Sequence, residues 1–244
     1  MKAMIIAAGE GKRLANYSKN KPKTLVEVSG MPILCYILNN LIKEGIKDIL
    51  IVTGYNGKMI REFVKREYGK LNVDYVHNED YDKTNNIYSV YLTKSKMINN
   101  SFILINSDVL FHSDILKDLK NSSKSGLILS VDLNKNLGEE EMKVRIEEDL
   151  IVEISKEIDP KKADGEYIGL TRIDKEMSKL FYQILEETIK DKGTGVFYEE
   201  AFQSIINHGY DVYYESTKGL PWIEIDTPED LRVAMDKVAP NIKN

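Results

Sequence analysis

Apolar runs of strand length alternate with amphipathic segments of helix length along the first half of the chain. The runs at residues 2–6, 49–53 and 102–106 are too short for helices and suit buried parallel strands. Between the first two runs, residues 33–42 follow Pro32 and repeat apolar side chains every three or four positions, which predicts a helix. Such alternation predicts an α/β fold in which helices cover both faces of a mostly parallel sheet.

The alternation continues to about residue 132. The further expected elements are strands at residues 73–77 and 127–131, a helix at residues 58–67 and a helix that starts after Ser113 as its N-cap. Ligands bind such sheets at the carboxyl ends of the strands. The loop after residues 2–6 and the Ser107-Asp108 turn are therefore expected to open on the same edge.

The second half has a different pattern. Residues 142–147 and 150–155 predict a hairpin that turns at Glu148-Asp149, and apolar positions between Met177 and Ile189 predict a long amphipathic helix. The other expected elements are strands at residues 166–171, 211–215 and 222–225, and helices at residues 197–206 and 227–238. The length of 244 residues fits one large domain, which we expect to span the whole chain.

Two glycines follow the first predicted strand, in the order Gly9-Glu10-Gly11. Glycine backbone can approach a ligand closely, and its exposed N–H groups bind anions. Lys12, Arg13 and Lys23 stand nearby and add positive charge. The spacing matches neither a dinucleotide-binding fingerprint nor a P-loop, so an ordinary strand-to-loop turn is the alternative reading.

Composition narrows the choice of partners. Apolar residues make up 42% and charged residues 30% of the chain, which excludes a disordered protein. The balance of 34 basic and 39 acidic residues gives a net charge of −5, which argues against nucleic-acid binding and for a local anion site. No apolar run reaches membrane length and no signal peptide is visible, so we expect no membrane contact and a cytoplasmic location.

The single cysteine, Cys35, excludes an internal disulfide and fits a buried structural thiol.

Asp108 and Asp226 each follow a predicted buried strand at an expected strand-to-helix junction. An aspartate there commonly caps the next helix. Two aspartates at carboxyl ends of strands can instead converge on Mg²⁺, which prefers one or two carboxylates together with substrate phosphates. Asp114 and Glu224 are the alternative carboxylates.

The order Ala-Ala-Gly-x-Gly-x-Arg-Leu, followed by Pro22-Lys23, resembles the signature of nucleotidyltransferases that join a phosphorylated small molecule to a nucleoside monophosphate. The resemblance implies a three-layer α/β/α, Rossmann-like (GT-A-like) fold with a mostly parallel mixed sheet. It divides the single domain into a nucleotide-binding half (1–132), an acceptor-binding half (133–225) and a closing helix (226–244). The residues that it implies for the nucleotide phosphates are Ala7, Ala8, Gly9, Glu10, Gly11, Lys12, Arg13, Lys23 and Asp108.

The same resemblance implies that Arg13, Lys23 and Lys143 act in catalysis and that Asp108 and Asp226 hold the magnesium cofactor.

The segment Asn85-Asn86-Ile87-Tyr88-Ser89 is similar to the segment that faces the base in cytidylyltransferases acting on phosphocholine and related compounds. Amide and hydroxyl groups can pair with the amino and carbonyl groups of cytosine. The resemblance therefore assigns Asn85, Asn86 and Ser89 to base recognition. As plain chemistry, the segment is also a polar loop that caps a helix.

Four residues of the second half are expected at the acceptor. Lys143 resembles the lysine that approaches the transferred phosphate in these cytidylyltransferases, and Glu166 and Tyr167 lie in the segment that corresponds to their acceptor site. With Trp222, Tyr167 could form an aromatic cage for a quaternary ammonium group. Core packing is the alternative for both aromatic residues.

The resemblance, closest to the phosphocholine, 2-aminoethylphosphonate and inositol phosphate cytidylyltransferases, implies an enzyme that transfers CMP from CTP to a small phosphate or phosphonate monoester and releases pyrophosphate. Similar enzymes suggest a homodimer. The alternatives are a sugar-1-phosphate uridylyl- or thymidylyltransferase and a nucleotide-binding regulatory subunit without catalysis. A glycosyltransferase is disfavoured because Asp108-Val109-Leu110 lacks an Asp-x-Asp metal motif.

Overall fold

The fold is built on one large mixed β-sheet. The computed structural model describes residues 1–14, 21–134 and 137–242, so the last two residues of the expected closing segment lie outside the described residues. The described strands of the sheet run in the order β5 (Asn72–His77), β4 (Asp48–Thr53), β1 (Lys2–Ala7), β6 (Phe102–Asn106), β11 (Gly165–Ile173), β8 (Leu127–Asp132), β12 (Val212–Ser216), β10 (Leu150–Ser155) and β9 (Lys143–Glu147).

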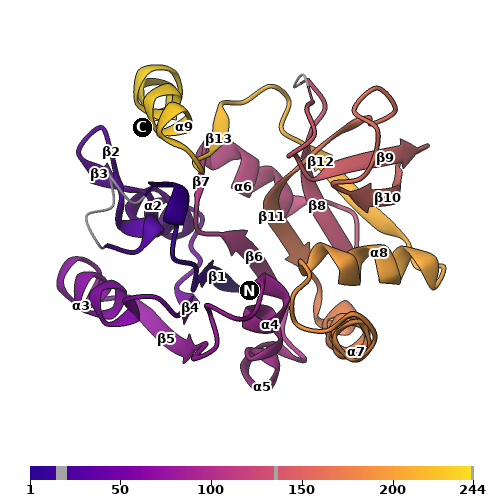
Figure 1. The fold of residues 1–244 in the computed structure, drawn as a ribbon, viewed down its shortest axis with the longest axis horizontal. Helices are drawn as coiled ribbons and strands as arrows, with labels where there is room; N and C mark the ends of the chain where they lie inside the picture. Colours follow the sequence, from indigo (N-terminus) through magenta and orange to yellow (C-terminus); the bar gives the residue numbers. More distant parts are fainter. Residues whose placement is uncertain (15–20, 135–136, 243–244) are drawn as a thin grey trace.

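Strand direction separates two parts of this sheet. The strands β5, β4, β1 and β6 are parallel to one another, as the alternating first half predicts. The long strand β11 then runs antiparallel to both β6 and β8 and joins the two parts. Beyond it, β9 and β10 form the predicted hairpin. The sheet is therefore parallel in its first part and mixed in its second (Figure 1).

Helices cover both faces because side chains alternate along each strand. In β1, Ala3 and Ile5 pack into one buried cluster, whereas Met4 packs into a second cluster on the other face. The helices packed on the first face are α2 (Ile33–Lys43), α3 (Gly57–Glu67), α6 (Ser113–Asn121) and α9 (Pro228–Val233). Those on the second face are α4 (Asn86–Tyr91), α5 (Lys94–Met97), α7 (Lys175–Lys192) and α8 (Glu199–Asn207).

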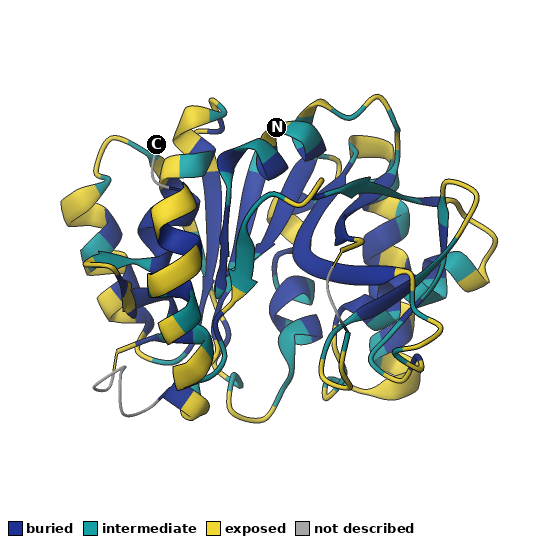
Figure 2. Ribbon diagram, turned by 90° about the horizontal axis from the view of Figure 1, so that it is seen from above, coloured by how far each residue is buried: buried dark blue, intermediate teal, exposed yellow. Residues whose placement is uncertain are grey.

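Figure 2 shows the buried strands between helices whose outer sides are exposed, so the predicted three-layer α/β/α arrangement is confirmed. None of the described helices combines the length and the apolar composition that crossing a bilayer requires.

The expected strand-to-helix junction is wrong for Asp108 and correct for Asp226, which lies between β13 (Trp222–Glu224) and α9. Asp108 lies in a turn between two strands, β6 and β7 (Val109–Phe111), because no helix begins until Ser113. Asp226 follows β13, which pairs with β7 in a separate two-stranded sheet and not in the main sheet.

Of two expected helix starts, the one at Ser113 is wrong and the one at Thr227 is confirmed. Ser113 is the first residue of α6 and not its cap, because the imidazole of His112 accepts the hydrogen bond from the backbone N–H of Asp114 at 3.2 Å. Thr227 does begin the closing segment, through a capping box with Asp230. That segment continues as a π-helical turn, η3 (Ala234–Val238), and a short helix, α10 (Ala239–Ile242).

A glycine in β11 lets the two parts of the sheet approach each other. Gly169 has a φ of +81°, and a Cβ at this position would lie 2.7 Å from Nδ2 of Asn106 in the neighbouring strand. The register of β11 against β8 shifts between Tyr167 and Thr171, around this glycine. Both the backbone angle and the close contact therefore require glycine.

Gly169→Ala is expected to lower the free energy of unfolding by about 2–4 kcal/mol, because left-handed strain and overpacking add together. The matched control is Gly209→Ala, since Gly209 has a φ of +79° but nothing within 4 Å of an added Cβ. This control carries the backbone strain alone and should lose only about 1–2 kcal/mol. Urea unfolding of both variants measures the difference, and equal losses would show that the contact with Asn106 is unimportant.

Candidate functional site

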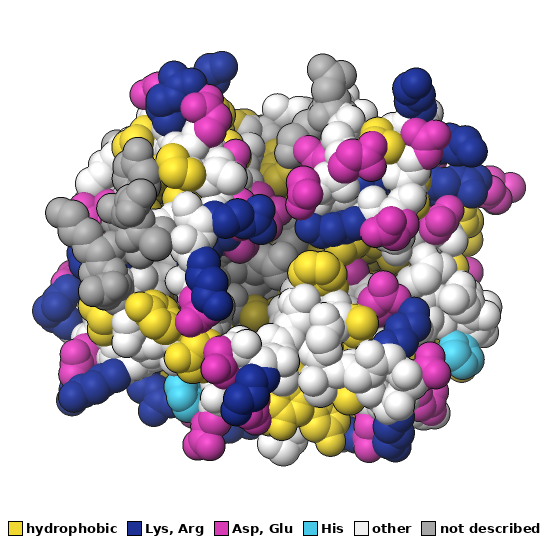
Figure 3. Space-filling model, viewed as in Figure 1, with side chains coloured by type: hydrophobic (Ala, Val, Ile, Leu, Met, Phe, Trp, Pro, Cys, Tyr) yellow, Lys and Arg dark blue, Asp and Glu magenta, His cyan; other side chains and the backbone are white. Residues whose placement is uncertain are grey.

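A cavity of about 440 Å³ opens at the carboxyl ends of β1 and β6, beside β11. Figure 3 shows this face hollowed at its centre, with Lys and Arg side chains on both sides of the hollow. The residues expected at the site that line it are Ala7, Gly9, Glu10, Gly11, Lys12, Arg13, Lys23, Asn85, Asn86, Asp108, Tyr167 and Asp226. Those outside its described lining are Ala8, Ser89, Lys143, Glu166 and Trp222. Of the two alternative carboxylates, Glu224 lines the cavity and Asp114 does not.

The glycine loop folds onto Lys23. Gly11 has a φ of +64°, and a Cβ there would lie 2.7 Å from Cβ of Lys23. The space beside Gly9 is open, with no atom within 4 Å of a Cβ built on it. A ligand can therefore approach the backbone at Gly9, whereas glycine at position 11 serves the packing of the loop.

Lys23 lies between two carboxylates. Its Nζ donates to Oδ2 of Asp108 at 2.8 Å and also to Oδ1 of Asp226, and its side chain is only 12% exposed. Burial by itself would lower the pKa of Lys23, but the charges of the two aspartates outweigh it and raise this pKa well above its usual value. Arg13 adds a second cation, with Nη2 3.3 Å from Oδ2 of Asp226.

The pairing of β7 with β13 brings the two aspartates together although they are far apart in sequence. Val109 lies opposite Glu224, and the backbone N–H of Ile225 donates to the carbonyl oxygen of Asp108 at 3.0 Å. The carboxylate of Asp230 then accepts from the N–H of Asp226 at 3.0 Å and fixes the chain beyond the strand. Neither Asp108 nor Asp226 is the helix cap, since Thr227 has that role.

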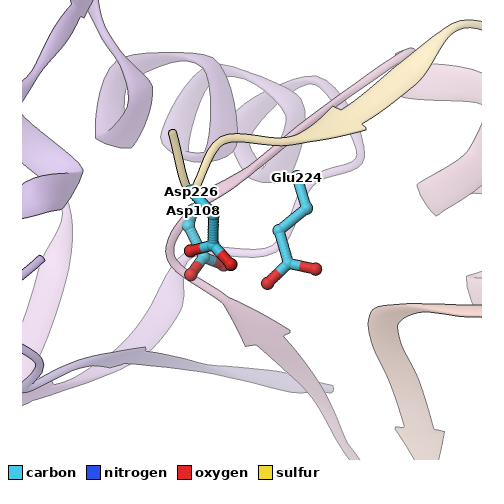
Figure 4. Close-up of side chains that lie close together, drawn as sticks. All are labelled: Asp108, Glu224 and Asp226. Atoms are coloured by element: carbon cyan, nitrogen blue, oxygen red, sulfur yellow. The ribbon is translucent and has the colours of Figure 1, made fainter. Parts of the chain in front are cut away.

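Glu224 joins the two aspartates in an acidic cluster. One carboxylate oxygen from each of Asp108, Glu224 and Asp226 lies within 4.8 Å of the others, and Figure 4 shows the three side chains converging. Glu224 as a residue is exposed, but loss of hydration around its carboxyl group, followed by repulsion from both aspartates, raises its pKa above the usual value. Oδ1 of Asp108 is buried and without a hydrogen-bond partner in the described structure. Three carboxylates so close together need more positive charge than Lys23 and Arg13 supply. Their oxygens are ligands that suit a divalent metal such as Mg²⁺.

The Asn85-Asn86 segment connects the two halves of the chain. The side chain of Asn85 caps α4 by accepting from the N–H of Asn86 at 2.7 Å, and the N–H of Asn85 donates to the carbonyl of Thr194. Oδ1 of Asn86 accepts from the N–H of Tyr198 at 2.8 Å. Ser89 is buried behind them and accepts from Nδ2 of Asn78, away from the cavity.

A chain of hydroxyl groups stiffens the deep end of the cavity. The hydroxyl of Tyr198 donates to Oδ1 of Asn106 at 3.0 Å. Because each hydroxyl has one proton, Tyr167 then donates to Tyr198 at 2.9 Å, and Thr171 donates to Tyr167 at 2.7 Å. Burial raises the pKa of both tyrosines far above the usual value, so both hydroxyls stay protonated.

Lys143 and Trp222 have partners outside the cavity. Lys143 is fully buried, and its Nζ donates to the carbonyl oxygens of three residues in the preceding loop, Gly138, Glu139 and Glu141. Nε1 of Trp222 donates to Oδ2 of Asp132 at 2.7 Å. The structure therefore does not assemble the expected aromatic pair of Tyr167 and Trp222 around one space.

Lys156 and Glu199 are among the cavity residues that the sequence did not point to. Lys156 follows β10, lines the cavity and places Nζ 5.1 Å from the ring centroid of Phe197. Glu199 begins α8, is 5% exposed and also lines the cavity. In the sequence, Lys156 directly follows the predicted hairpin and Glu199 stands near the start of a predicted helix. These positions do not single the two residues out, because many other lysines and glutamates of this chain have similar positions.

Burial raises the pKa of Glu199 from its usual 4.5 to about 7. The folded chain thus holds this proton more tightly than the unfolded chain. Protonation of Glu199 therefore adds to the free energy of unfolding. This contribution is fully present below about pH 4.5 and is lost as pH rises through about 7, which lowers the free energy of unfolding by an amount on the order of 3 kcal/mol. Glu199→Gln should remove this dependence. Thermal unfolding of both proteins from pH 5 to 8 measures it, and parallel profiles would contradict it.

Known proteins are similar to this chain in sequence and in fold. The model of the family described as "Nucleotidyl transferase" matches residues 2–141, more than half of the chain. The choline-phosphate cytidylyltransferase of Streptococcus pneumoniae is 41% identical over 103 residues, which cover 42% of this chain and 43% of that protein. The CMP-5'-(3-aminopropyl)phosphonate synthase of Streptomyces rubellomurinus is 36% identical over 43% of this chain and 17% of that protein. The matched part thus spans less than half of each of these two relatives.

One solved structure shows the likeness along nearly the whole chain. The CTP:phosphocholine cytidylyltransferase of Streptococcus pneumoniae superposes with a TM-score of 0.80 at 26% identity, covering 96% of this chain and 97% of that one. The superposition confirms the expected nucleotidyltransferase fold. From the family match over residues 2–141, together with this shared fold, the chain belongs to the nucleotidyl transferase family.

Proposed function

We propose that this protein transfers CMP from CTP to a small phosphate or phosphonate monoester and releases pyrophosphate. The observation that carries the proposal is one cavity that combines the glycine loop, the Lys23-paired carboxylates and a further cation, Lys156. The names of the two relatives, one acting on choline phosphate and one making a CMP-linked phosphonate, support cytidylyl transfer. In the reaction an acceptor oxygen bonds to the α-phosphorus of CTP while the bond from that phosphorus to the departing pyrophosphate breaks.

The nucleotide half neutralises and positions the triphosphate. Backbone N–H groups near Gly9 and the side chains of Arg13 and Lys23 provide donors for the phosphate oxygens. Lys23 is held rigidly by its two ion pairs, so little reorganisation is needed when charge develops. Asn85 and Asn86 stand at the same cavity and are the proposed contacts for the base.

Asp108 and Asp226, with Glu224 beside them, would hold Mg²⁺. When bound, the metal supplies charge neutralisation at the triphosphate. The buried, unpartnered Oδ1 of Asp108 is an oxygen suited to this role.

The acceptor half needs no strong general base, because a phosphate or phosphonate monoester already carries an anionic nucleophilic oxygen. Lys156 is the proposed contact for the acceptor phosphate, since it lines the cavity. Lys143, which the sequence suggested for this role, donates to three backbone carbonyls and is proposed instead to hold the loop before β9.

The activity is tested by incubating the protein with Mg²⁺, one of CTP, UTP, dTTP and GTP, and a panel of phosphate and phosphonate monoesters and sugar 1-phosphates. Pyrophosphate release is expected with CTP and a non-sugar acceptor, and chelation by EDTA should abolish it. Preference for UTP with glucose 1-phosphate would replace the cytidylyl assignment by uridylyl transfer. Nucleotide binding without turnover would support a regulatory subunit.

Lys23→Ala should lower kcat by about 10²–10⁴-fold, because the triphosphate loses a preorganised cation. It also leaves three crowded carboxylates without their main counter-charge, so Mg²⁺ should raise the melting temperature of the variant more than that of the parent.

The control for this variant is Lys218→Ala, whose exposed lysine pairs with Asp118 away from the cavity and should leave kcat unchanged. Turnover of the Lys23 variant within roughly tenfold of the parent would remove Lys23 from the catalytic assignment. Circular dichroism shows whether each variant remains folded.

A further inference from the structure

Glu199 presents a buried, unsatisfied carboxylate oxygen at the acceptor side of the cavity. Its Oε2 is inaccessible to solvent and has no hydrogen-bond partner in the described structure, and the residue is only 5% exposed. It lies next to Tyr198, whose N–H bonds to Asn86, so its backbone is fixed to the other half of the chain. A buried carboxylate oxygen without a partner costs free energy, and a ligand that donates to that oxygen recovers the cost.

The protein's own cations do not neutralise Glu199. No lysine, arginine or histidine nitrogen among the described residues forms an ion pair with its carboxylate. Lys156 is the cation that acts on it, but the Lys156 ammonium lies over the ring of Phe197. The Glu199 carboxylate in the acceptor half of the cavity can therefore be paired with a cationic group of a ligand.

The kind of cation follows from what surrounds this carboxylate. A quaternary ammonium has no N–H to donate and is recognised by open aromatic faces. Here Trp222 lies outside the cavity lining, Tyr167 is 4% exposed, and the Phe197 ring has Lys156 over it. A primary ammonium instead donates charge-assisted hydrogen bonds, which a carboxylate oxygen without a hydrogen-bond partner accepts.

We infer that Glu199 selects acceptors that carry an N–H-bearing ammonium group at the end opposite their phosphorus, namely aminoalkyl phosphates or phosphonates. This inference rests on the proposed cytidylyl transfer and names its acceptor class. Lys156 binds the anionic end of such a zwitterion and Glu199 binds its cationic end. Glu199 is a specificity-determining residue, since the ammonium group takes no part in bond making or breaking.

The test compares three acceptors with CTP and Mg²⁺: 2-aminoethylphosphonate, its bulkier N,N,N-trimethyl derivative, and propylphosphonate, which is isosteric with the primary amine. Phosphoethanolamine, phosphocholine and propyl phosphate form the matching ester series, which distinguishes phosphonate from phosphate acceptors. The parent protein should use the primary amine with a kcat/KM at least about 100-fold above that of the propyl compound, because a site built for a donor rejects an analogue without one. The trimethyl compound should be used as poorly as the propyl compound.

Glu199→Gln should lower kcat/KM for the primary amine by roughly 100-fold and leave both the propyl compound and the KM for CTP unchanged. The control is Glu200→Gln, since the neighbouring Glu200 pairs with Lys192 outside the cavity lining and should leave all values unchanged. An equal fall for all acceptors in the Glu199 variant would overturn the inference.

The acceptor preference of the parent protein tests the inference even if the Glu199 variant does not fold. Equal use of the trimethyl and primary amine compounds would overturn the assignment of Glu199 while leaving cytidylyl transfer in place. Absence of pyrophosphate release by the parent with every acceptor would overturn the proposed function and this inference together.

Discussion

The ion pairs of Lys23 with Asp108 and Asp226 are the interaction on which the site depends. The ammonium joins a turn after β6 to the end of β13, and both lie against the glycine loop that follows β1. Gly11 must be glycine because the loop passes directly over the Lys23 side chain. The loop, the lysine and the two carboxylates therefore form one unit, in which moving any member displaces the others.

This unit is electrostatically incomplete without a ligand. Asp108, Glu224 and Asp226 crowd together, and the proton held by Glu224, with a pKa near 8, partly relieves their repulsion. Glu199 is in a similar state on the acceptor side, with a pKa near 7 that burial produces. Carboxyl groups with a raised pKa of this kind mark functional sites, because a ligand of opposite charge stabilises their ionised form. A metal ion would neutralise the cluster of Asp108, Glu224 and Asp226, and a cationic substituent of the acceptor would neutralise Glu199.

The two halves of the chain are coupled close to this cavity. Hydrogen bonds from Tyr198 to Asn86 and from Asn85 to Thr194 tie α4 to the segment before α8. Deeper in, the hydroxyl chain through Tyr167 and Tyr198 ends on Asn106, at the carboxyl end of β6. The residues proposed to read the base and the acceptor are thus connected through short polar contacts, which would keep the two proposed substrates in a fixed relation.

The sequence by itself determined most of the strands and helices of the main sheet and placed a glycine loop beside two cationic residues. Periodicity of apolar residues located β6 to the residue and the hairpin of β9 and β10 to within one residue, because these patterns arise from local geometry and burial. The glycines with Arg13 and Lys23 were visible because residues close in sequence supply most of that loop. The two aspartates were also singled out from the sequence, although Asp108 lies between two strands and not before the expected helix.

Only the tertiary structure decided which side chains share the cavity. The β7–β13 pairing joins positions more than a hundred residues apart, and no local pattern encodes that register. Long side chains reach in directions that sequence does not fix, so Lys143 turned to backbone carbonyls while Lys156 lines the cavity. Glu199 became significant only through burial, which depends on every element packed around it. Local sequence thus determined the strands, helices and loops, whereas long-range packing determined which charged side chains lie close together.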